Sequence, residues 1–335
     1  MAVTMQDVAR RAAVSAKTVS RVVNDEPHIS PDKRARVLAA IDELGYRLNP
    51  AARTLRTGRS GVIGLGLPDL REPYYAELAH AVLQQAGRRG LTVLVDPTGG
   101  DRDRELALLR GRGGGLDGVL LYALGVGAQD ADAAALPAVL LGERVEPGAA
   151  AAVDADPAVA AAVAHLVETG RRRIAVLGAD PRPGSPGARR TAAFRRAARE
   201  AGLDVDEALL VDVGPRWGRQ AGADAAARLL DSGLPVDALV AHTDALALGA
   251  LRAALDRGLR VPEDLAVVGS GDTEDARYAV PSLTSIAQGT SEVAGTAVAL
   301  LEDRIEGRPP RDDGARAAAA VELRLRESTL GVGVA

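Results

Sequence analysis

Short apolar segments that fit β-strands alternate with longer segments that fit α-helices from Gly61 almost to the end of the chain. The apolar runs of a first series are VIGLGL, LTVLVD, GVLLYA and AVLLGE, and those of a second are RIAVLG, DALVAH and LAVVGS, with a further strand near 208–213. Helices are expected at 74–89, 102–111, 188–201, 220–231 and 244–257, with another ending at Gly170. Strands that are apolar throughout belong to parallel sheets covered on both faces. The alternation therefore predicts an α/β core of two doubly wound parallel-sheet subdomains.

The two subdomains share the end of the chain. A helix from about 290 to 306 and the strand AVELRLRES are expected to cross back between them. The N-subdomain then takes about 61–158 and 291–318, and the C-subdomain about 159–290 and 319–335. Ligands of such sheets lie beyond the carboxyl ends of the strands, so we expect a small-molecule site in a cleft between the subdomains.

The first 48 residues have the pattern of short helices instead. Thr4 followed by Asp7 is close to a capping box that starts one helix. Ser15 is a good N-cap for a second helix, which ends at Asn24. The tight break at 13–14 makes these two helices a helix-turn-helix.

A third helix completes the predicted headpiece. Ser30 is its N-cap, Pro31 lies in its first turn, and Gly45 ends it. The apolar residues expected to face inward in the three helices are Val8, Ala9, Ala12, Val19, Val22, Val23, Val37, Leu38, Ile41 and Leu44.

Charge divides the chain into a basic start and an acidic remainder. Residues 1–60 hold eleven Lys or Arg against six Asp or Glu, a net charge of +5, whereas residues 61–335 hold 30 against 39, a net charge of −9. A basic end suits binding to a duplex, because Lys and Arg release counterions condensed on the phosphates. A solvated helical surface is the alternative interpretation of the charge alone.

The absence of cysteine and the distribution of apolar residues indicate the compartment in which the protein is expected. The chain has no cysteine, which excludes structural disulfides and thiolate zinc sites. No secretory segment precedes Thr4, and no stretch of about 20 apolar residues lacks charges. We therefore expect a cytoplasmic protein that does not bind a membrane.

Several enzyme signatures are missing from the core sequence. Lys17 and Lys33 are the only lysines, so the core has neither a P-loop lysine nor a Schiff-base lysine. There is no GxSxG motif, and GLGLPD has Asp69 where a dinucleotide fingerprint needs its third glycine. The four histidines lack metal-ligand spacing. We expect no catalytic residue, no metal and no cofactor.

The second helix of the headpiece is expected to turn a polar face outward, formed by Ala16, Lys17, Ser20 and Arg21. Arg or Lys near the start of a recognition helix can bond guanine O6 and N7 in the major groove, and Ala can contact a thymine methyl. A plain surface helix in a structural three-helix bundle is the alternative.

The runs TMQDVARRAAVSAKTVSRVVN and ISPDKRARVLAAIDELGYRLNPAARTLRTGRS combine these features, and they resemble the lac repressor/galactose repressor (LacI/GalR) family. The likeness continues to RESTL at 326–330. It implies a transcriptional repressor with an all-α helix-turn-helix headpiece and a periplasmic-binding-protein-like core. The implied partners are a pseudo-palindromic operator in double-stranded DNA, a carbohydrate effector and a second copy of the chain. Because no heptad extension follows the core, we expect a homodimer rather than a tetramer.

The resemblance also assigns residues to DNA. Ala16 and Lys17 match the pair that selects the operator, and Arg21 matches a base-contacting residue. Residues 49–60 match a hinge helix and linker, with Leu55 as the wedge that unstacks a base step; a plain linker is the alternative. The residues expected at DNA are Thr4, Ser15, Ala16, Lys17, Thr18, Ser20, Arg21, Asn24, Tyr46, Asn49, Ala52, Arg53 and Leu55.

For the effector, the resemblance assigns residues at strand ends: Tyr74, Tyr75, Arg190, Trp217, Thr243, Asp244 and Asp272. The fork of Arg190 suits effector oxygens, and the ring of Trp217 suits a sugar ring. A core aromatic is the alternative for each ring. Gly271 stands where the family has an acid, with Asp272 one residue later. Either Asp272 replaces that acid with altered geometry, or the effector lacks the corresponding hydroxyl pair.

Two other functions share part of this pattern. A periplasmic sugar-binding protein would have the same core, but residues 1–58 and the missing export signal argue against it. An α/β enzyme would turn over a sugar or nucleoside. A regulator would instead bind a palindrome in a salt-sensitive way.

Overall fold

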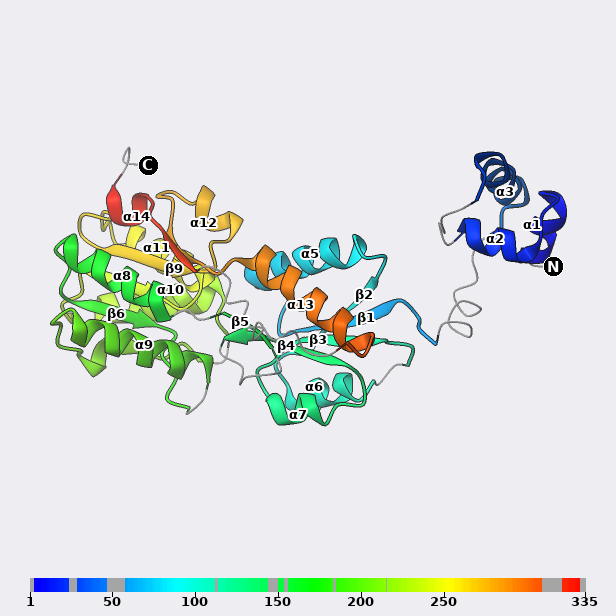
Figure 1. The fold of residues 1–335 in the computed structure, drawn as a ribbon. Helices are drawn as coiled ribbons and strands as arrows, with labels where there is room; N and C mark the ends of the chain where they lie inside the picture. Colours follow the sequence, from blue (N-terminus) through cyan, green and yellow to red (C-terminus); the bar gives the residue numbers. More distant parts are fainter. Residues whose placement is uncertain are drawn as a thin grey trace. The chain divides into compact units, whose positions relative to one another are not determined.

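A computed structural model gives the fold of the chain (Figure 1). It describes residues 3–23, 29–46, 58–111, 114–143, 150–153, 156–182, 185–214, 216–308 and 321–331. The chain forms two compact units, Met1–Ser60 and Gly61–Ala335.

The first unit, the headpiece, contains the helices α1 (Met5–Arg11), α2 (Ala16–Val23) and α3 (Pro31–Leu44). The capping box at the start of α1 is confirmed: the Asp7 amide donates to Thr4 Oγ1 at 3.3 Å, and the Thr4 amide donates to the Asp7 carboxylate at 2.9 Å. Ser15 caps α2, since its Oγ accepts from the Thr18 amide at 3.1 Å. Ser30 holds the N-cap position of α3 without a side-chain cap bond.

The headpiece core is formed by apolar residues of all three helices, with Val8, Val19 and Val37 fully buried. One predicted core residue is wrong: Leu38 is 52% exposed. Successive helical residues point about 100° apart, and the inward stripe of α3 follows Val37 and Ala40, so Leu38 lies off that stripe.

The first lobe of the core contains a parallel sheet with the strand order β2-β1-β3-β4-β5. Its strands are β1 (Val62–Leu67), β2 (Thr92–Pro97), β3 (Gly118–Tyr122), β4 (Ala138–Glu143) and β5 (Ala150–Val153). The helices α5 (Pro73–Gly87) and α13 (Thr290–Ile305) pack on one face, and α6 (Arg102–Leu109) and α7 (Ala128–Asp132) on the other. Alternate residues of β3 and β4 enter the two apolar clusters, which explains why these strands are apolar throughout.

The glycines of VIGLGL have a packing role in this lobe. A Cβ at Gly66 would lie 2.6 Å from Leu121 Cδ1 and 2.7 Å from Leu108 Cδ2. Only glycine therefore lets α6 approach β1 this closely.

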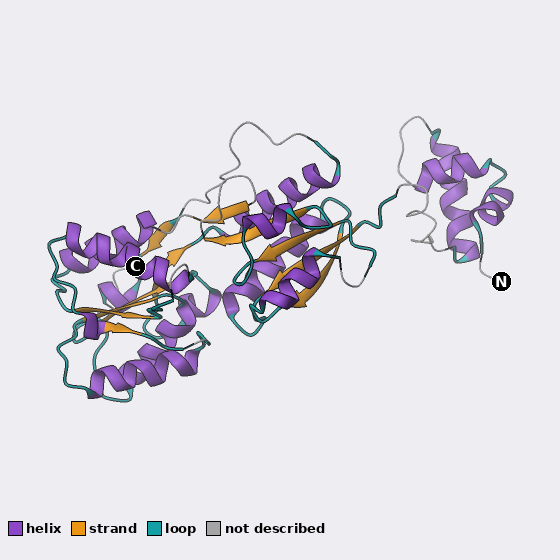
Figure 2. Ribbon diagram, turned by 90° about the horizontal axis from the view of Figure 1, so that it is seen from below, coloured by secondary structure: helices purple, strands orange, loops and turns teal. Residues whose placement is uncertain are grey.

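The second lobe contains a sheet with the order β11-β10-β9-β8-β6-β7, parallel except for the pair β10 and β11. Its strands are β6 (Ile174–Leu177), β7 (Leu210–Val211), β8 (Ala238–Ala241), β9 (Ala266–Ser270), β10 (Thr284–Ala287) and β11 (Glu322–Arg324). The helices α10 (Arg219–Asp231) and α11 (Asp244–Leu255) cover one face, and α8 (Asp156–Glu168) and α9 (Pro186–Glu200) the other. Figure 2 shows helices on both sides of the strands. Short elements complete the lobe: η1 (Glu207–Leu209), α12 (Glu274–Tyr278) and α14 (Glu327–Leu330).

The chain passes between the lobes after β5, after β10, and again between α13 and β11. The helix expected at 290–306 thus packs on the first sheet, and the strand near 320–328 joins the second. The strands β5 and β10 and the helices α7, α12 and α14 were not predicted.

Candidate functional site

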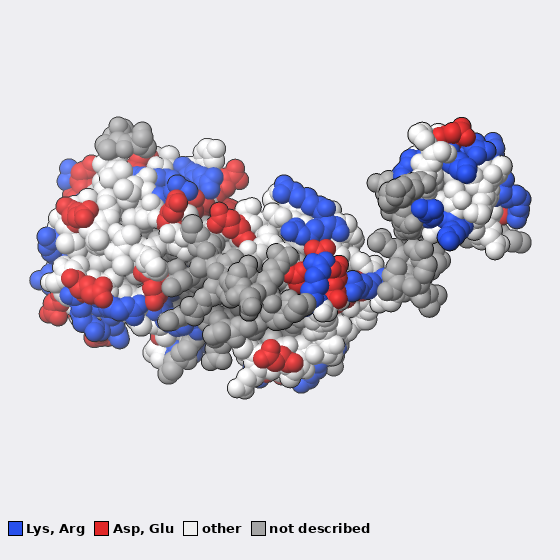
Figure 3. Space-filling view, in the orientation of Figure 1, with Lys and Arg blue, Asp and Glu red and all other residues white. Residues whose placement is uncertain are grey.

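The outward face of α2 is the first candidate site. Val19 and Val22 are buried, while Ala16 and Lys17 are exposed and Arg21 is half-buried. The helix sequence AKTVSRVV contains no acidic residue, so its surface charge is positive. Figure 3 shows Lys and Arg over the surface of this unit. Elsewhere in the headpiece acids accompany the basic side chains, as in the 2.6 Å ion pair between Arg11 and Glu43.

The other residues predicted to contact DNA have varied surroundings. Thr4 donates its hydroxyl to Asp7 at 2.6 Å, and Thr18 and Ser15 share a hydroxyl bond of 2.9 Å. Ser20 is half-buried, and Tyr46 packs against the headpiece core. The remaining predicted residues, which lie outside the described residues, are Asn24, Asn49, Ala52, Arg53 and Leu55.

In the first lobe of the core, three tyrosines form an edge-to-face cluster beside the carboxyl end of the sheet. Tyr74 and Tyr75 belong to the first turn of α5, and Tyr122 ends β3. The ring of Tyr75 lies 5.5 Å from that of Tyr74 and 4.9 Å from that of Tyr122. The predicted aromatic pair is therefore part of a packed group of three.

In the second lobe, Arg190, Trp217 and His242 form a compact group. Arg190 extends from α9, donates to the carbonyl of His242, and lies over the Trp217 ring at 5.9 Å from its centroid. The His242 ring is 5.7 Å from Trp217, and its Nδ1 donates to the Gly178 carbonyl at 2.9 Å. Burial lowers the pKa of His242 to about 3, aided by the Arg190 charge, so this imidazole is neutral.

The tyrosine cluster and the Arg190 group act on each other electrostatically. Burial raises the pKa of the Tyr75 hydroxyl well above its ordinary value, and the Arg190 charge opposes that shift. Arg190 of the second lobe thus acts on the Tyr75 hydroxyl of the first lobe, and Trp217 lies beside Arg190.

Thr243 and Asp244, two more predicted effector residues, bind other parts of the chain. Thr243 Oγ1 caps α11 by accepting from the Leu246 amide at 3.2 Å. Asp244 Oδ2 accepts from the amide and the hydroxyl of Thr273 at 2.8 and 3.1 Å. Its Oδ1 accepts from Ser285 Oγ at 2.5 Å. Burial raises the pKa of this carboxyl, and these hydrogen bonds oppose the rise.

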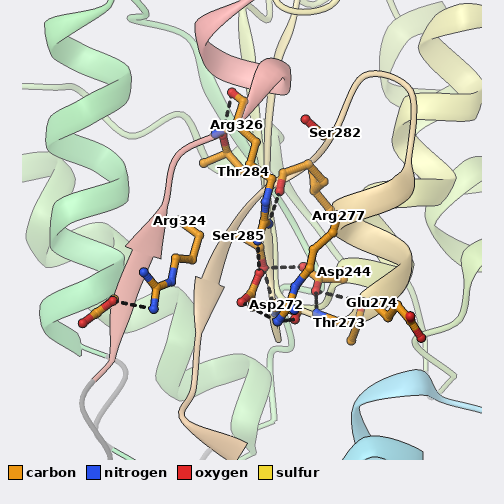
Figure 4. Close-up of polar contacts among 12 residues, drawn as sticks. Asp244, Asp272, Thr273, Glu274, Arg277, Ser282, Thr284, Ser285, Arg324 and Arg326 are labelled. Atoms are coloured by element: carbon orange, nitrogen blue, oxygen red, sulfur yellow. Dashed lines mark hydrogen bonds and ion pairs between the residues drawn. The ribbon is translucent and has the colours of Figure 1, made fainter. Parts of the chain in front are cut away.

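Asp272 belongs to the same polar cluster, which Figure 4 shows. Its backbone is in the left-handed region, with φ 51°, and its amide donates to Ser285 Oγ at 3.0 Å. The carboxylate binds Arg326 through one oxygen and Arg277 through the other. Its two oxygens are thus engaged by residues of the chain, at the position next to Gly271.

Sequence reasoning did not identify two acids at the edge where the lobes meet. Glu77 of α5 accepts from the Glu274 amide of α12 at 2.8 Å, a bond between the two lobes. Glu72 precedes α5, and burial raises its pKa to about 7, opposed by Arg219. The signal for Glu72 was its place in the loop after β1, beside the predicted Tyr74.

Two kinds of site are absent from the part of the chain that the structure describes. No group of three or more His, Cys, Asp or Glu there is arranged to hold a metal ion. No helix there is long and apolar enough to cross a membrane.

Comparisons with known proteins match both units. Residues 4–49 match the family model "Bacterial regulatory proteins, lacI family", and residues 163–329 match "Periplasmic binding protein-like domain". The HTH-type transcriptional regulator CelR of Thermobifida fusca is 36% identical over 97% of this chain and 98% of its own.

Solved structures of regulators also resemble nearly the whole chain. A complex of the transcriptional regulator CelR with cellobiose is 33% identical, covers 97% of this chain and 99% of its own, and has a TM-score of 0.69. The lac repressor dimer bound to operator and the anti-inducer ONPF is 29% identical, covers 98% and 100%, and has a TM-score of 0.76.

Proposed function

This chain belongs to the LacI family of bacterial transcriptional regulators, and we propose on that basis that it is a repressor. Its affinity for a specific operator is controlled by a sugar that binds between the lobes of its core. The observation that carries the proposal is the face of α2. It presents Ala16, Lys17 and Arg21 from a capped helix without acids, next to a buried valine stripe. Such a helix can enter the major groove and bond base edges.

The core supports the part of the proposal that concerns sugar binding. Arg190 and Trp217 offer a fork of donors and an aromatic face, and the tyrosine cluster lies within electrostatic range. Sugar rings stack on aromatic faces while their hydroxyls bond charged groups. The similar regulator CelR binds cellobiose, which supports a carbohydrate as the class of effector here.

A second copy of the chain completes the regulator. Tyr278 and Val280, in the segment from α12 to β10, are 79% and 85% exposed. Large apolar side chains with so much exposed surface suit an interface. The similar lac repressor is a dimer on its operator. Two headpieces related by a two-fold axis would read a pseudo-palindrome.

Residues 49–60 are proposed to link headpiece and core as a hinge helix, with Leu55 as a wedge in the minor groove. The hinge would couple the two binding events. A sugar that binds one arrangement of the lobes more tightly than the other changes the operator affinity, by an amount set by the difference between its two binding free energies. The operator changes the affinity for the sugar by the same factor.

Selection from a pool of random duplexes tests this function directly. The full chain should enrich a two-fold symmetric sequence, and Lys17→Ala should enrich it poorly or enrich a different one. If the pool stays random after repeated rounds while the protein remains folded, the proposal is wrong.

A further inference from the structure

Glu77 makes a direct hydrogen bond from one lobe of the core to the other. It belongs to α5 in the first lobe, and its Oε1 accepts from the backbone amide of Glu274 in the second lobe at 2.8 Å. Neither residue lies in a segment by which the chain passes between the lobes. The bond therefore forms only in lobe arrangements that bring α5 to the start of α12.

The amide of Glu274 has no acceptor inside its own helix. Glu274 is the first residue of α12, after the N-cap Thr273, and the first amides of a helix lack an intrahelical acceptor. The preceding amide, that of Thr273, donates to Asp244 within the second lobe. The Glu274 amide instead takes its acceptor from the first lobe.

The helix α12 is fixed to the second lobe. Ala276 is fully buried, and its carbonyl accepts from the Leu283 amide at 2.8 Å. Arg277 donates to the Asp272 carboxylate at 3.1 Å. Figure 4 shows Arg277 of this helix beside Asp272. These contacts make α12 move with the second lobe.

The helix α5 is fixed to the first lobe. Leu78, the residue after Glu77, is fully buried, and Tyr74, one turn earlier, is buried in the same apolar cluster. Each end of the bond is thus carried by an element that its own lobe holds in place. The bond therefore depends on the position of one lobe relative to the other.

Resting on the regulatory function proposed above, we propose that the bond from the Glu274 amide to Glu77 is a latch that stabilises one of the two lobe arrangements. The operator prefers one of these arrangements, so breaking the latch changes the operator affinity although neither residue belongs to the headpiece. Glu77 is a positioning residue in this scheme, because it acts through the placement of the lobes.

Two substitutions on opposite lobes break the same bond. Glu77→Ala removes the acceptor. Glu274→Pro removes the donor at a helix position that proline favours, and Thr273 before it has φ −64° and ψ 160°, which suit a residue that precedes proline. Each has a matched control that keeps the bond: Glu77→Gln retains a side-chain oxygen acceptor, and Glu274→Ala retains the amide.

Hydrogen exchange of the full chain, measured by mass spectrometry at residue resolution, tests whether the latch forms. The Glu274 amide should exchange at least about fivefold faster in Glu77→Ala than in the wild type. In Glu77→Gln its rate should stay near the wild-type rate. The Thr273 amide, which bonds within one lobe, should exchange equally in all three proteins. Equal exchange of Glu274 in wild type and Glu77→Ala would overturn the inference.

Addition of the selected duplex tests whether the latch responds to the operator. A saturating amount should change the exchange rate of the Glu274 amide by about threefold or more, and leave that of Thr273 unchanged. Slower exchange means that the operator prefers the latched arrangement, and Glu77→Ala should then bind the duplex more weakly. Faster exchange means the reverse, and Glu77→Ala should then bind it more tightly. An exchange rate that ignores the duplex, or an affinity that moves against this sign, would also overturn the inference.

Fluorescence anisotropy with the same duplex compares the variants. Glu77→Ala, Glu274→Pro and the double variant should shift the dissociation constant by the same factor, about threefold or more, because all three lack the same bond. Glu77→Gln and Glu274→Ala should stay near the wild type. Shifts that add up in the double variant would indicate separate damage at the two positions and contradict the latch.

Failure of the proposed function would give a different result. If the wild type prefers no duplex over random DNA, the proposed repressor function is wrong. The exchange of the Glu274 amide in the free protein would still decide whether the latch forms.

Discussion

The carboxylate of Asp244 joins three segments of the second lobe at the residue scale. It lies at the start of α11 and receives Thr273 and Ser285, which are 29 and 41 residues further along the chain. Gly269 belongs to the same arrangement, because a Cβ there would lie 2.3 Å from Asp244 Oδ1. The aspartate thus ties the start of α11 to Thr273, next to α12, and to the strand β10.

Asp244→Ala should lower the free energy of unfolding of the core by about 3 kcal/mol, because it leaves buried donors of Thr273 and Ser285 without an acceptor. Urea unfolding measures the change. Asp256→Ala, at an exposed position after the same helix, is the control and should cost far less. Equal losses in the two variants would contradict the role given to Asp244.

Lys17→Ala should weaken binding to the selected operator by about 1–3 kcal/mol and affect random DNA less, because a base contact carries sequence preference. Arg199→Ala removes the same charge from an exposed site on α9 and should change neither affinity. Fluorescence anisotropy titrations at one salt concentration give the affinities of both variants for operator and for random DNA. A Lys17→Ala loss that is equal on operator and random DNA would place this side chain on phosphates instead.

Single residues are also where prediction from sequence reached its limit. The spacing of Val19 and Val22 and the cap at Ser15 were sufficient to predict the outward face of α2, because these interactions are local. Whether Asp244 and Asp272 face a ligand or the protein depends on Thr273, Ser285 and Arg326, and pairing over such separations leaves no pattern in the sequence. The burial that raises the pKa of Glu72 likewise depends on the fold, although its place in the loop after β1 was visible in the sequence.

At the scale of elements, the loop between β3 and α7 depends on one buried acid. Glu105 is fully buried on α6 and accepts from the amides of Leu124, Gly125 and Val126. Arg102, from the same helix, bonds the Gly125 carbonyl at 2.6 Å and Asp130 at 2.8 Å. The helix α6 therefore fixes a loop at the carboxyl end of the first sheet.

Glu105→Ala should destabilise the core by about 2–4 kcal/mol, since three amides lose their acceptor. Hydrogen exchange of those amides should quicken more than exchange in β3 itself. Asp103→Ala, an exposed change on the same helix, should leave both quantities near the wild-type values. Unchanged protection of residues 124–126 in Glu105→Ala would refute this assignment.

Long, periodic elements could be predicted, and short ones could not. The strands β1, β3 and β4 and the helices α9, α10 and α11 lie within a few residues of their predicted bounds, because an apolar run or a helical stripe fixes each one. The strand β5, with the sequence AAAV, has little β-propensity, and β10, with TSIA, is held by its neighbours β9 and β11. Tertiary pairing determines such elements.

At the scale of the whole molecule, the proposed function requires two copies of the chain. Val280→Asp would place a charge on the exposed apolar segment after α12, and it should shift the protein to monomers in sedimentation velocity. Operator affinity should fall with it, since each headpiece reads one half-site. Arg199→Asp is the control for added acidity. A Val280→Asp protein that stays dimeric would exclude this segment from the interface.

The coupling between sugar and operator is the most direct test of the account. The selected duplex is titrated with the full chain, with and without a sugar that the chain binds, and fluorescence anisotropy gives the two operator dissociation constants. Calorimetry with and without operator gives the two dissociation constants of the sugar. For each ligand, the dissociation constant in the presence of the other ligand should differ from that in its absence by at least about fivefold. The account predicts the same factor for the operator and for the sugar. A sugar that binds equally well with and without operator, and leaves the duplex equally well bound, would contradict it.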